Sequence, residues 1–211
     1  MAYEFSSSSS QFLRAESFAS LSFPFTISCQ FNPKNITQNM VLAAISDAGG
    51  GNRCVMVLGG ALAGDPVRID VLGAGAADST VGFTSNAWQH ACGVWSSTTS
   101  RTVYLNGSNS STSTASVVQQ TINRVLIGMR TSNDVNGLFM EGFIAEVGIW
   151  NAALTAAEVA SLADGMTCDK VRPQNLVFYA PLVRDLIDAK GGLTITNNNG
   201  ATVANHPRVY A

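Results

Sequence analysis

The sequence predicts an all-β protein built as an antiparallel two-sheet sandwich. Turn-forming residues recur roughly every 8 to 15 positions, and the apolar runs between them are short. Within these runs apolar and polar residues alternate, as they do in half-buried strands. A length of 211 residues fits one such sandwich better than two small domains, so a single domain over residues 1–211 is expected.

The strands are predicted from this alternation. In FTISCQF (25–31) every second side chain is apolar, and the side chains between them are polar. Similar runs predict eight further strands: 40–46, 53–59, 67–73, 88–95, 101–107, 124–129, 139–150 and 175–182. No fixed repeat is present, which disfavours a propeller or a solenoid.

A run of five serines at 6–10 separates two short strand-like pieces, residues 3–5 and 12–13. Small polar residues between two such pieces are typical of a turn rather than of a linker. The sequence therefore predicts a β-hairpin at the N-terminus.

One short helix is expected near 155–164. Thr155 followed by Glu158 three residues later forms a capping-box pattern, and Gly165 ends the helix. The apolar stripe is narrow, so the helix must lie against the sandwich. The C-terminal segment 170–211 is expected to pack back on the same sandwich.

The composition excludes several classes of partner. Hydrophobic residues make up 46% of the chain and charged residues only 12%, about half of the usual ~25%. A net charge of −2 gives no basic surface for nucleic acid or an anionic membrane. No signal peptide and no apolar run long enough for membrane insertion is recognisable.

The four cysteines are widely separated and show no C-x-x-C spacing. This argues against a zinc site or a redox pair and favours reduced thiols buried as small hydrophobic side chains. They are Cys29, Cys54, Cys92 and Cys168.

Several ordered motifs carry a family resemblance. WQHACGVW is followed by RTVYLNG, by RVLIGMR and by GFIAEVGIWNAALTAAEVASL. This order resembles the laminin-G-like, concanavalin A-like lectin and glucanase jelly rolls. The residues that match the family pattern most clearly are Trp88, His90, Tyr104, Asn106, Gly107, Glu146 and Trp150. The resemblance implies a jelly-roll sandwich in which these residues are structural, and it covers lectins, adhesion modules, pentraxin-like shells and phage virion proteins alike.

The stretch 88–107 has a structural interpretation and a functional one. Trp88, His90, Cys92 and Val94 fall on one strand face, and Asn106-Gly107 then supplies a tight turn. A packed, hydrogen-bonded His90 is favoured over a catalytic base or a metal ligand.

The acidic residues do not predict an enzyme. Glycoside hydrolysis uses two carboxylates about 5–9 Å apart, which alternate positions on one strand could supply. The glutamates contain no E-x-D or E-x-E pattern, and Glu141 and Glu146 lie five residues apart, on opposite faces of a regular strand. We therefore expect a non-enzymatic protein.

Two kinds of ligand site remain open. Proteins of this fold often bind Ca²⁺ at a loop rim, and Asn133, Asp134 and Asn136, together with Asp47, are the candidate ligands; a solvated turn is the alternative. Otherwise no cofactor is expected. For a glycan, Trp95 is the candidate aromatic contact, against core or edge packing.

The low content of charged residues and the lack of a recognisable signal peptide favour a virion surface protein of a tailed phage, either a capsid decoration or a tail-appendage component. It would be made in the host cytoplasm and would contact other virion proteins or copies of itself. The alternative is a carbohydrate-binding adhesion module, with or without calcium.

Overall fold

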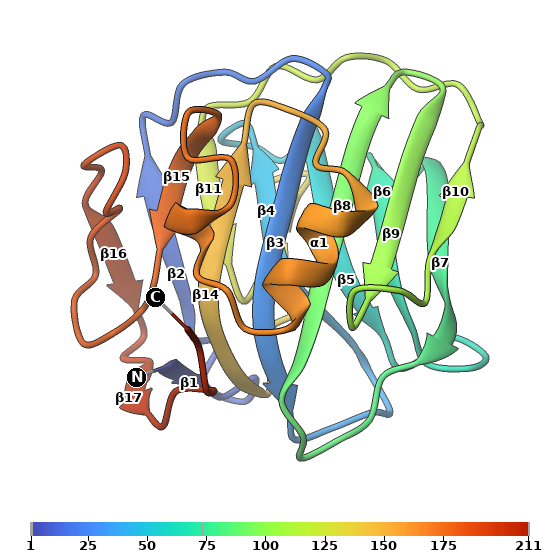
Figure 1. The fold of residues 1–211 in the computed structure, drawn as a ribbon. Coiled ribbons are helices and arrows are strands. Elements are labelled where there is room, and N and C mark those ends of the chain that lie inside the picture. Colours follow the sequence, from blue (N-terminus) through green and yellow to red (C-terminus); the bar gives the residue numbers. More distant parts are fainter. Residues whose placement is uncertain (1, 73, 211) are drawn as a thin grey trace.

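The computed structural model describes residues 2–72 and 74–210, which form two antiparallel sheets packed face to face (Figure 1). The front sheet, nearest the viewer in Figure 1, has eight strands in the order β10-β9-β8-β3-β14-β1-β17, with β15 also beside β14. The back sheet has seven strands in the order β16-β2-β11-β4-β5-β6-β7. The predicted all-β, antiparallel two-sheet sandwich with one short helix is confirmed.

The strands have the following bounds. The front sheet contains β10 (Ser111–Ser113), β9 (Ser100–Leu105), β8 (Gln89–Ser97), β3 (Phe25–Pro33), β14 (Gly142–Trp150), β1 (Ala2–Phe5), β17 (Thr202–Ala204) and β15 (Leu176–Ala180). The back sheet contains β16 (Ile195–Asn198), β2 (Phe12–Glu16), β11 (Arg124–Ile127), β4 (Asn39–Ser46), β5 (Arg53–Gly59), β6 (Pro66–Val71) and β7 (Ala74–Gly82). A separate hairpin consists of β12 (Arg130–Ser132) and β13 (Val135–Gly137).

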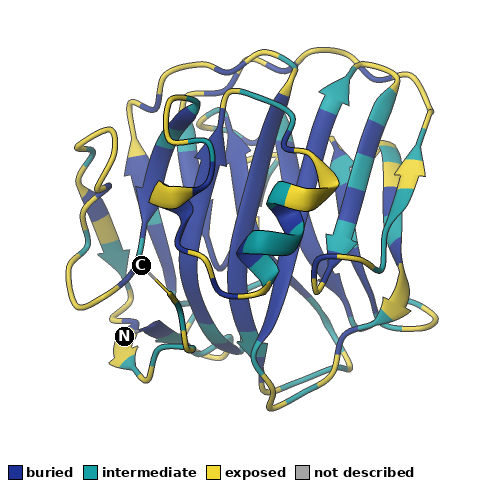
Figure 2. Ribbon diagram, in the orientation of Figure 1, coloured by how far each residue is buried: buried dark blue, intermediate teal, exposed yellow. Residues whose placement is uncertain are grey.

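Alternation along the strands decides which side chains enter the core. On β3, Phe25, Ile27 and Phe31 are buried between the sheets, whereas Ser28 and Gln30 point to the outer face. The central strands of both sheets are buried along most of their length, and exposed residues concentrate in the loops (Figure 2).

The predicted N-terminal hairpin is wrong. β1 pairs with β14 and β17 in the front sheet, whereas β2 pairs with β11 and β16 in the back sheet. The serine run is therefore a turn that crosses between sheets. Each short strand gains more by extending a different sheet over the shared core than by forming an isolated two-stranded ribbon.

The helix α1 (Ala156–Ala163) lies over the outer face of the front sheet (Figure 1). The capping box is present: the Thr155 hydroxyl accepts from the Glu158 N–H, and the Glu158 carboxylate accepts from the Thr155 N–H. Gly165 follows the helix at a φ of 101°, and the N–H of Met166 reaches back to the carbonyl of Ser161, which satisfies the last turn.

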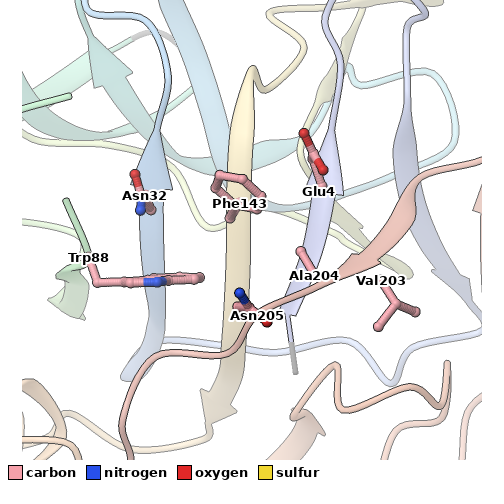
Figure 3. A pocket seen from close by; sticks show the side chains of 7 residues that line it. All are labelled: Glu4, Asn32, Trp88, Phe143, Val203, Ala204 and Asn205. Atoms are coloured by element: carbon pink, nitrogen blue, oxygen red, sulfur yellow. The ribbon is translucent and has the colours of Figure 1, made fainter. Parts of the chain in front are cut away.

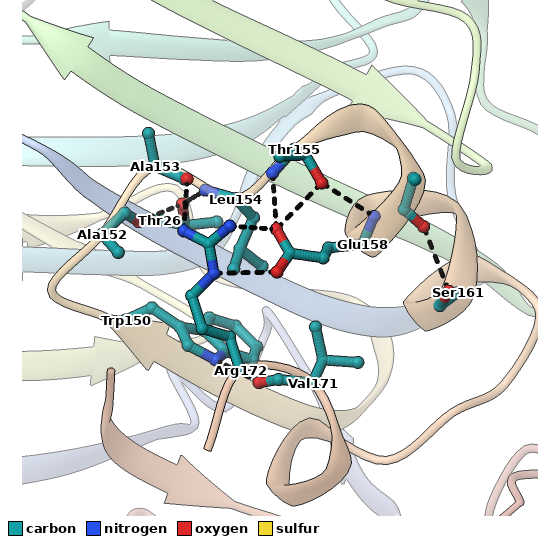
Figure 4. Close-up of polar contacts among 11 residues, drawn as sticks. Thr26, Trp150, Ala152, Ala153, Leu154, Thr155, Glu158, Ser161, Val171 and Arg172 are labelled. Atoms are coloured by element: carbon teal, nitrogen blue, oxygen red, sulfur yellow. Dashed lines mark hydrogen bonds and ion pairs between the residues drawn. The ribbon is translucent and has the colours of Figure 1, made fainter. Parts of the chain in front are cut away.

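Arg172 ties the start of α1 to the sheet (Figure 4). Its guanidinium binds both carboxylate oxygens of Glu158 at 2.8 and 2.6 Å and donates to the carbonyl of Ala153 at 2.9 Å. Beneath it, the indole N–H of Trp150 donates to the carbonyl of Val171 at 2.8 Å. The helix, the turn η1 (Cys168–Lys170) and the outer face of the front sheet thus enclose a second apolar cluster.

The C-terminal segment contributes strands to both sheets: β15 and β17 join the front sheet, and β16 joins the back sheet. All four cysteines are free and buried. Within the described residues, no helix has both the length and the apolar character that a membrane crossing requires.

Candidate functional site

The outer face of the front sheet carries an open groove near β1 and β17, with a volume of about 470 Å³ (Figure 3). Its lining comes from five strands that are neighbours in the sheet, or from residues directly beside them. We call this site the front-sheet groove. It is lined by Trp88, Asn32, Phe143, Glu4, Val203, Ala204 and Asn205.

Four of these side chains form one row across the strands. Asn32 is paired directly with Phe143, and Phe143 with Glu4. Trp88 continues the row at the start of β8, which pairs with the end of β3. Directly paired residues project from the same face of a sheet. Since neighbouring strands lie ~4.8 Å apart, the row runs for about 14 Å from Trp88 to Glu4, longer than a single sugar ring.

The two aromatic rings of the row lie close together. The ring centres of Trp88 and Phe143 are 6.2 Å apart and the ring planes are inclined by 45°. Both side chains are half-buried, so part of each ring remains available to a ligand. The ammonium of Lys34 lies 5.1 Å from the centre of the Phe143 ring, which helps to fix that ring in place.

Polar groups alternate with the rings. The Glu4 carboxylate is held by an ion pair with Lys34, and both side chains remain more than one-third exposed. The side-chain carbonyl of Asn32 has no hydrogen-bond partner within the described residues, and Asn205 is exposed at the rim. The groove therefore offers a carboxylate and two amides beside two aromatic faces.

Sequence reasoning missed this groove. The sequence places Trp88 on a structural strand face and gives Asn32, Phe143 and Glu4 no predicted role. The strand face was correct, because Cys92 and Val94 do lie on the outer side. The missing information is the order of strands in the sheet, since β8, β3, β14 and β1 are neighbours in space but far apart along the chain.

Trp95, the candidate aromatic contact for a glycan, lies in the core, as its alternative of core packing predicts. It is fully buried, and its ring stacks on Phe25 with the centres 4.9 Å apart. A ligand on the surface cannot reach it. The alternation of β8 explains the position, because Trp95 has the opposite parity to Trp88.

His90 is buried on the outer face of the front sheet, and its Nε2 lies 2.7 Å from the hydroxyl of Ser28. Its Nδ1 has no partner within the described residues. Burial lowers the pKa of His90 to about 3, so the ring is neutral. The turn at Asn106 and Gly107, with φ values of 52° and 76°, closes over it: the Asn106 side chain accepts from the His90 N–H.

The predicted calcium ligands lie in two loops that do meet. The N–H of Asp134 donates to the carbonyl of Gly49 at 2.8 Å, which brings 131–137 against 47–52. Each side chain is also explained by its own turn, because Asp47 accepts from Asn52. Asn136 accepts from the hydroxyl of Thr131, and Asn133 and Asp134 adopt positive φ.

Two carboxylates are few for Ca²⁺, which takes six to eight oxygen ligands. Within residues 2–72 and 74–210, no group of three or more His, Cys, Asp or Glu side chains is placed to hold a metal ion. The residues present therefore do not form a ready calcium site, and calcium binding by Asp47, Asn133 and Asp134 stays a prediction.

Glu146 occupies a bulge in β14, where the pairing with β3 shifts register between Ala145 and Gly148. Its carboxylate accepts from the hydroxyl of Tyr179 at 2.6 Å and lies 3.1 Å from Nε2 of His206. The side chain is buried, and it is not among the residues that line the front-sheet groove.

A family model described as the concanavalin A-like lectin/glucanases superfamily matches residues 6–160, most of the chain. No curated protein matches this sequence.

Solved structures with this fold include a heptameric pentraxin from Limulus polyphemus, which is 16% identical with a TM-score of 0.66; the match covers 91% of this chain and 87% of the pentraxin. A putative carbohydrate-binding protein from Bacteroides ovatus is 19% identical with a TM-score of 0.71, and the match covers 95% of this chain but 58% of that protein. Domain 4 of an arabinanase from Geobacillus stearothermophilus, solved with arabinotriose, is 18% identical with a TM-score of 0.55, covering 71% and 70%.

Proposed function

We propose that this chain, which belongs to the concanavalin A-like lectin/glucanase superfamily, binds a neutral oligosaccharide in the front-sheet groove. The observation that carries the proposal is the cross-strand row Trp88–Asn32–Phe143–Glu4. Sugar sites combine aromatic faces, which cover the apolar side of a ring, with a few polar groups that fix the hydroxyls.

The polar groups suit hydroxyl recognition. The Glu4 carboxylate accepts hydrogen bonds, whereas the amides of Asn32 and Asn205 can donate and accept. Hydroxyl groups are donors and acceptors as well, so both roles find partners along the row. The similar structures named above include a putative carbohydrate-binding protein and an arabinanase domain solved with arabinotriose, which supports the same proposal.

The groove favours binding over hydrolysis. Glu4 is the one carboxylate among its lining residues, and glycoside hydrolysis ordinarily requires two. We therefore keep the expectation of a non-enzymatic protein. The virion role expected from the sequence stays a separate prediction, and the carbohydrate-binding alternative takes precedence because it has a groove and similar structures behind it.

The test is binding of neutral oligosaccharides, first on a glycan array and then by calorimetry with each hit. Trp88→Ala and Phe143→Ala should each weaken binding by roughly 2- to 12-fold, the equivalent of 0.5–1.5 kcal/mol for one aromatic contact. Phe139→Ala is the matched control, because Phe139 is a half-buried aromatic residue that packs on the outer face of the back sheet. Absence of any neutral sugar hit, or equal losses in the control, would refute the proposal.

A further inference from the structure

The back sheet has a second, smaller pocket on its outer face, with a volume of about 140 Å³. The alternation of the strands places it there: Cys54, Met56 and Leu58 of β5 enter the core, so Arg53 and its alternate neighbours point outward. We call this pocket the arginine pocket. It is lined by Asn39, Arg53, Val55, Val57, Leu62, Arg68, Asp70, Arg130 and Leu138.

Positive charge concentrates in this pocket. Three of the chain's twelve basic residues line it, although the chain as a whole carries a net charge of −2. Arg68 is neutralised by Asp78, whose two carboxylate oxygens accept at 2.6 Å each. Arg53 and Arg130 share the remaining space with Asp70, so positive charge is in excess.

Arg53 is held in an unfavourable environment. One of its terminal nitrogens donates to the carbonyl of Gly50 at 2.7 Å, but its Nε is buried without a partner. Burial and, after it, the nearby charge of Arg130 lower the pKa of Arg53, and the carboxylates of Asp70 and Asp47 offset this only in part. No hydrogen bond or ion pair to the Arg130 side chain occurs within the described residues. Arg53 and Arg130 thus line one small pocket, and the N–H donors of Arg130 have no acceptor within the described residues.

An oxyanion would pair with this positive charge. Guanidinium groups bind carboxylate, sulfate and phosphate oxygens through paired N–H donors. A bound anion would accept from the terminal N–H groups of Arg130 and Arg53 and offset the repulsion between them. Val55, Val57 and Leu138 contribute an apolar floor, which lowers the local dielectric and strengthens such contacts.

The size of the pocket limits the ligand. Its volume is less than one-third of that of the front-sheet groove. It therefore suits a charged group rather than a row of sugar rings. We propose that the arginine pocket binds a compact oxyanion, either free in solution or carried as a sulfate or carboxylate group on an acidic saccharide.

The first experiment measures binding of inorganic sulfate by calorimetry and by ¹⁵N NMR of the arginine Nε–H groups, at constant ionic strength with chloride as the reference. Sulfate should shift the Arg53 Nε–H signal, and Arg130→Gln should weaken sulfate binding about tenfold, as expected for the loss of one charge-assisted contact. Arg208→Gln is the matched control, because it removes the same charge from an exposed position in the C-terminal tail.

Arg53→Lys provides a second variant that keeps the charge and removes the planar, paired N–H donors of the guanidinium, and it should weaken sulfate binding as well. Galactose 6-sulfate and galactose then identify the source of the anion. Tighter binding of the sulfated sugar than of inorganic sulfate indicates an acidic saccharide, whereas equal or weaker binding indicates the free anion. No sulfate-specific shift at Arg53, or equal affinities for the wild type and Arg130→Gln, would overturn the proposal.

This inference stands independently of saccharide binding in the front-sheet groove, because the two sites lie on the outer faces of different sheets. Trp88→Ala should leave sulfate binding unchanged, and Arg130→Gln should leave neutral sugar binding unchanged. The two binding measurements can therefore refute either proposal separately.

Discussion

We expect the buried histidine His90 to lower the stability of the protein in mild acid. The pKa of His90 is about 3 in the folded chain because the ring is buried, whereas an unfolded histidine titrates near 6.5. Below pH 6.5 the unfolded state therefore binds more protons than the folded state. The free energy of unfolding falls as the pH decreases from 6.5 towards 3, and the stabilisation is complete only above pH 6.5.

The size of the effect follows from the two pKa values. Between pH 7 and pH 5 the linkage relation gives a loss of about 2 kcal/mol from this one group. Most carboxylates titrate below this window, which leaves histidine as the main titrating side chain. The assay is denaturant unfolding at pH 7, 6 and 5, with the free energy of unfolding extrapolated to water at each pH.

His90→Gln removes the titrating ring and should flatten this pH dependence, whatever its effect on stability at pH 7. His206→Gln is the control, because His206 is the second of the two histidines in the chain. It should retain the loss of about 2 kcal/mol that His90 causes. If wild type and His90→Gln lose the same free energy between pH 7 and pH 5, the burial argument is refuted.

Four further outcomes are expected. Trp95→Ala should destabilise the fold by about 3–5 kcal/mol in thermal or denaturant unfolding, because the side chain is fully buried; Trp95→Phe should leave sugar affinity in calorimetry unchanged. Thr155→Ala should cost about 1 kcal/mol of unfolding free energy through loss of the helix cap, and a neutral result would show that Arg172 and Glu158 suffice. Arg101→Lys should lower the free energy of unfolding in denaturant by about 1–3 kcal/mol. The buried guanidinium donates to the carbonyls of residues 75, 98 and 115 and to the hydroxyl of residue 113, and one ammonium group cannot reach all four. Neutral sugar binding should be the same in EDTA and in calcium, because none of the candidate calcium ligands lines the front-sheet groove. A chelator-sensitive affinity would contradict this.

Local signals in the sequence predicted local structure well. The capping box at Thr155 and Glu158 marked the start of the helix, because each side chain satisfies a backbone N–H that the helix leaves free. Asn106-Gly107 marked a turn because both residues tolerate the positive φ that the turn requires. Alternation on β3 predicted the face that is buried between the sheets, because successive side chains of a strand point to opposite faces and the apolar ones on β3 all share one face.

Several strands carry no such signal. β7 (Ala74–Gly82) forms the edge of the back sheet, and its sequence AGAADSTVG has few large apolar residues because an edge strand buries little. β16 and β17 are equally polar and short. Their pairing depends on neighbours that are distant in the chain, so alternation within the segment could not reveal them.

The candidate site likewise depends on pairing between residues that are distant in the chain. Each groove residue is unremarkable in its own segment, and the chemistry appears only when the register places Asn32 beside Phe143 and Phe143 beside Glu4. Trp95 shows the converse: it precedes a polar loop, which leaves ligand contact and core packing both open from the sequence, and its parity on β8 directs it into the core. Site prediction here required the strand order, not better recognition of residue types.

The C-terminal tail explains why the groove can be preformed. Along one edge of β14, residues 142–144 pair with β1 and residues 147–150 pair with β15. Glu146 lies at the bulge between these two segments. The tail reaches this point, where His206 meets the Glu146 carboxylate, and the preceding residue, Asn205, lines the groove. The carboxylate itself accepts from the hydroxyl of Tyr179, and the His206 ring beside it places Asn205 at one wall of the groove. Because the other walls are strands, a saccharide would order few side chains on binding, and little of its interaction energy would be lost to that ordering.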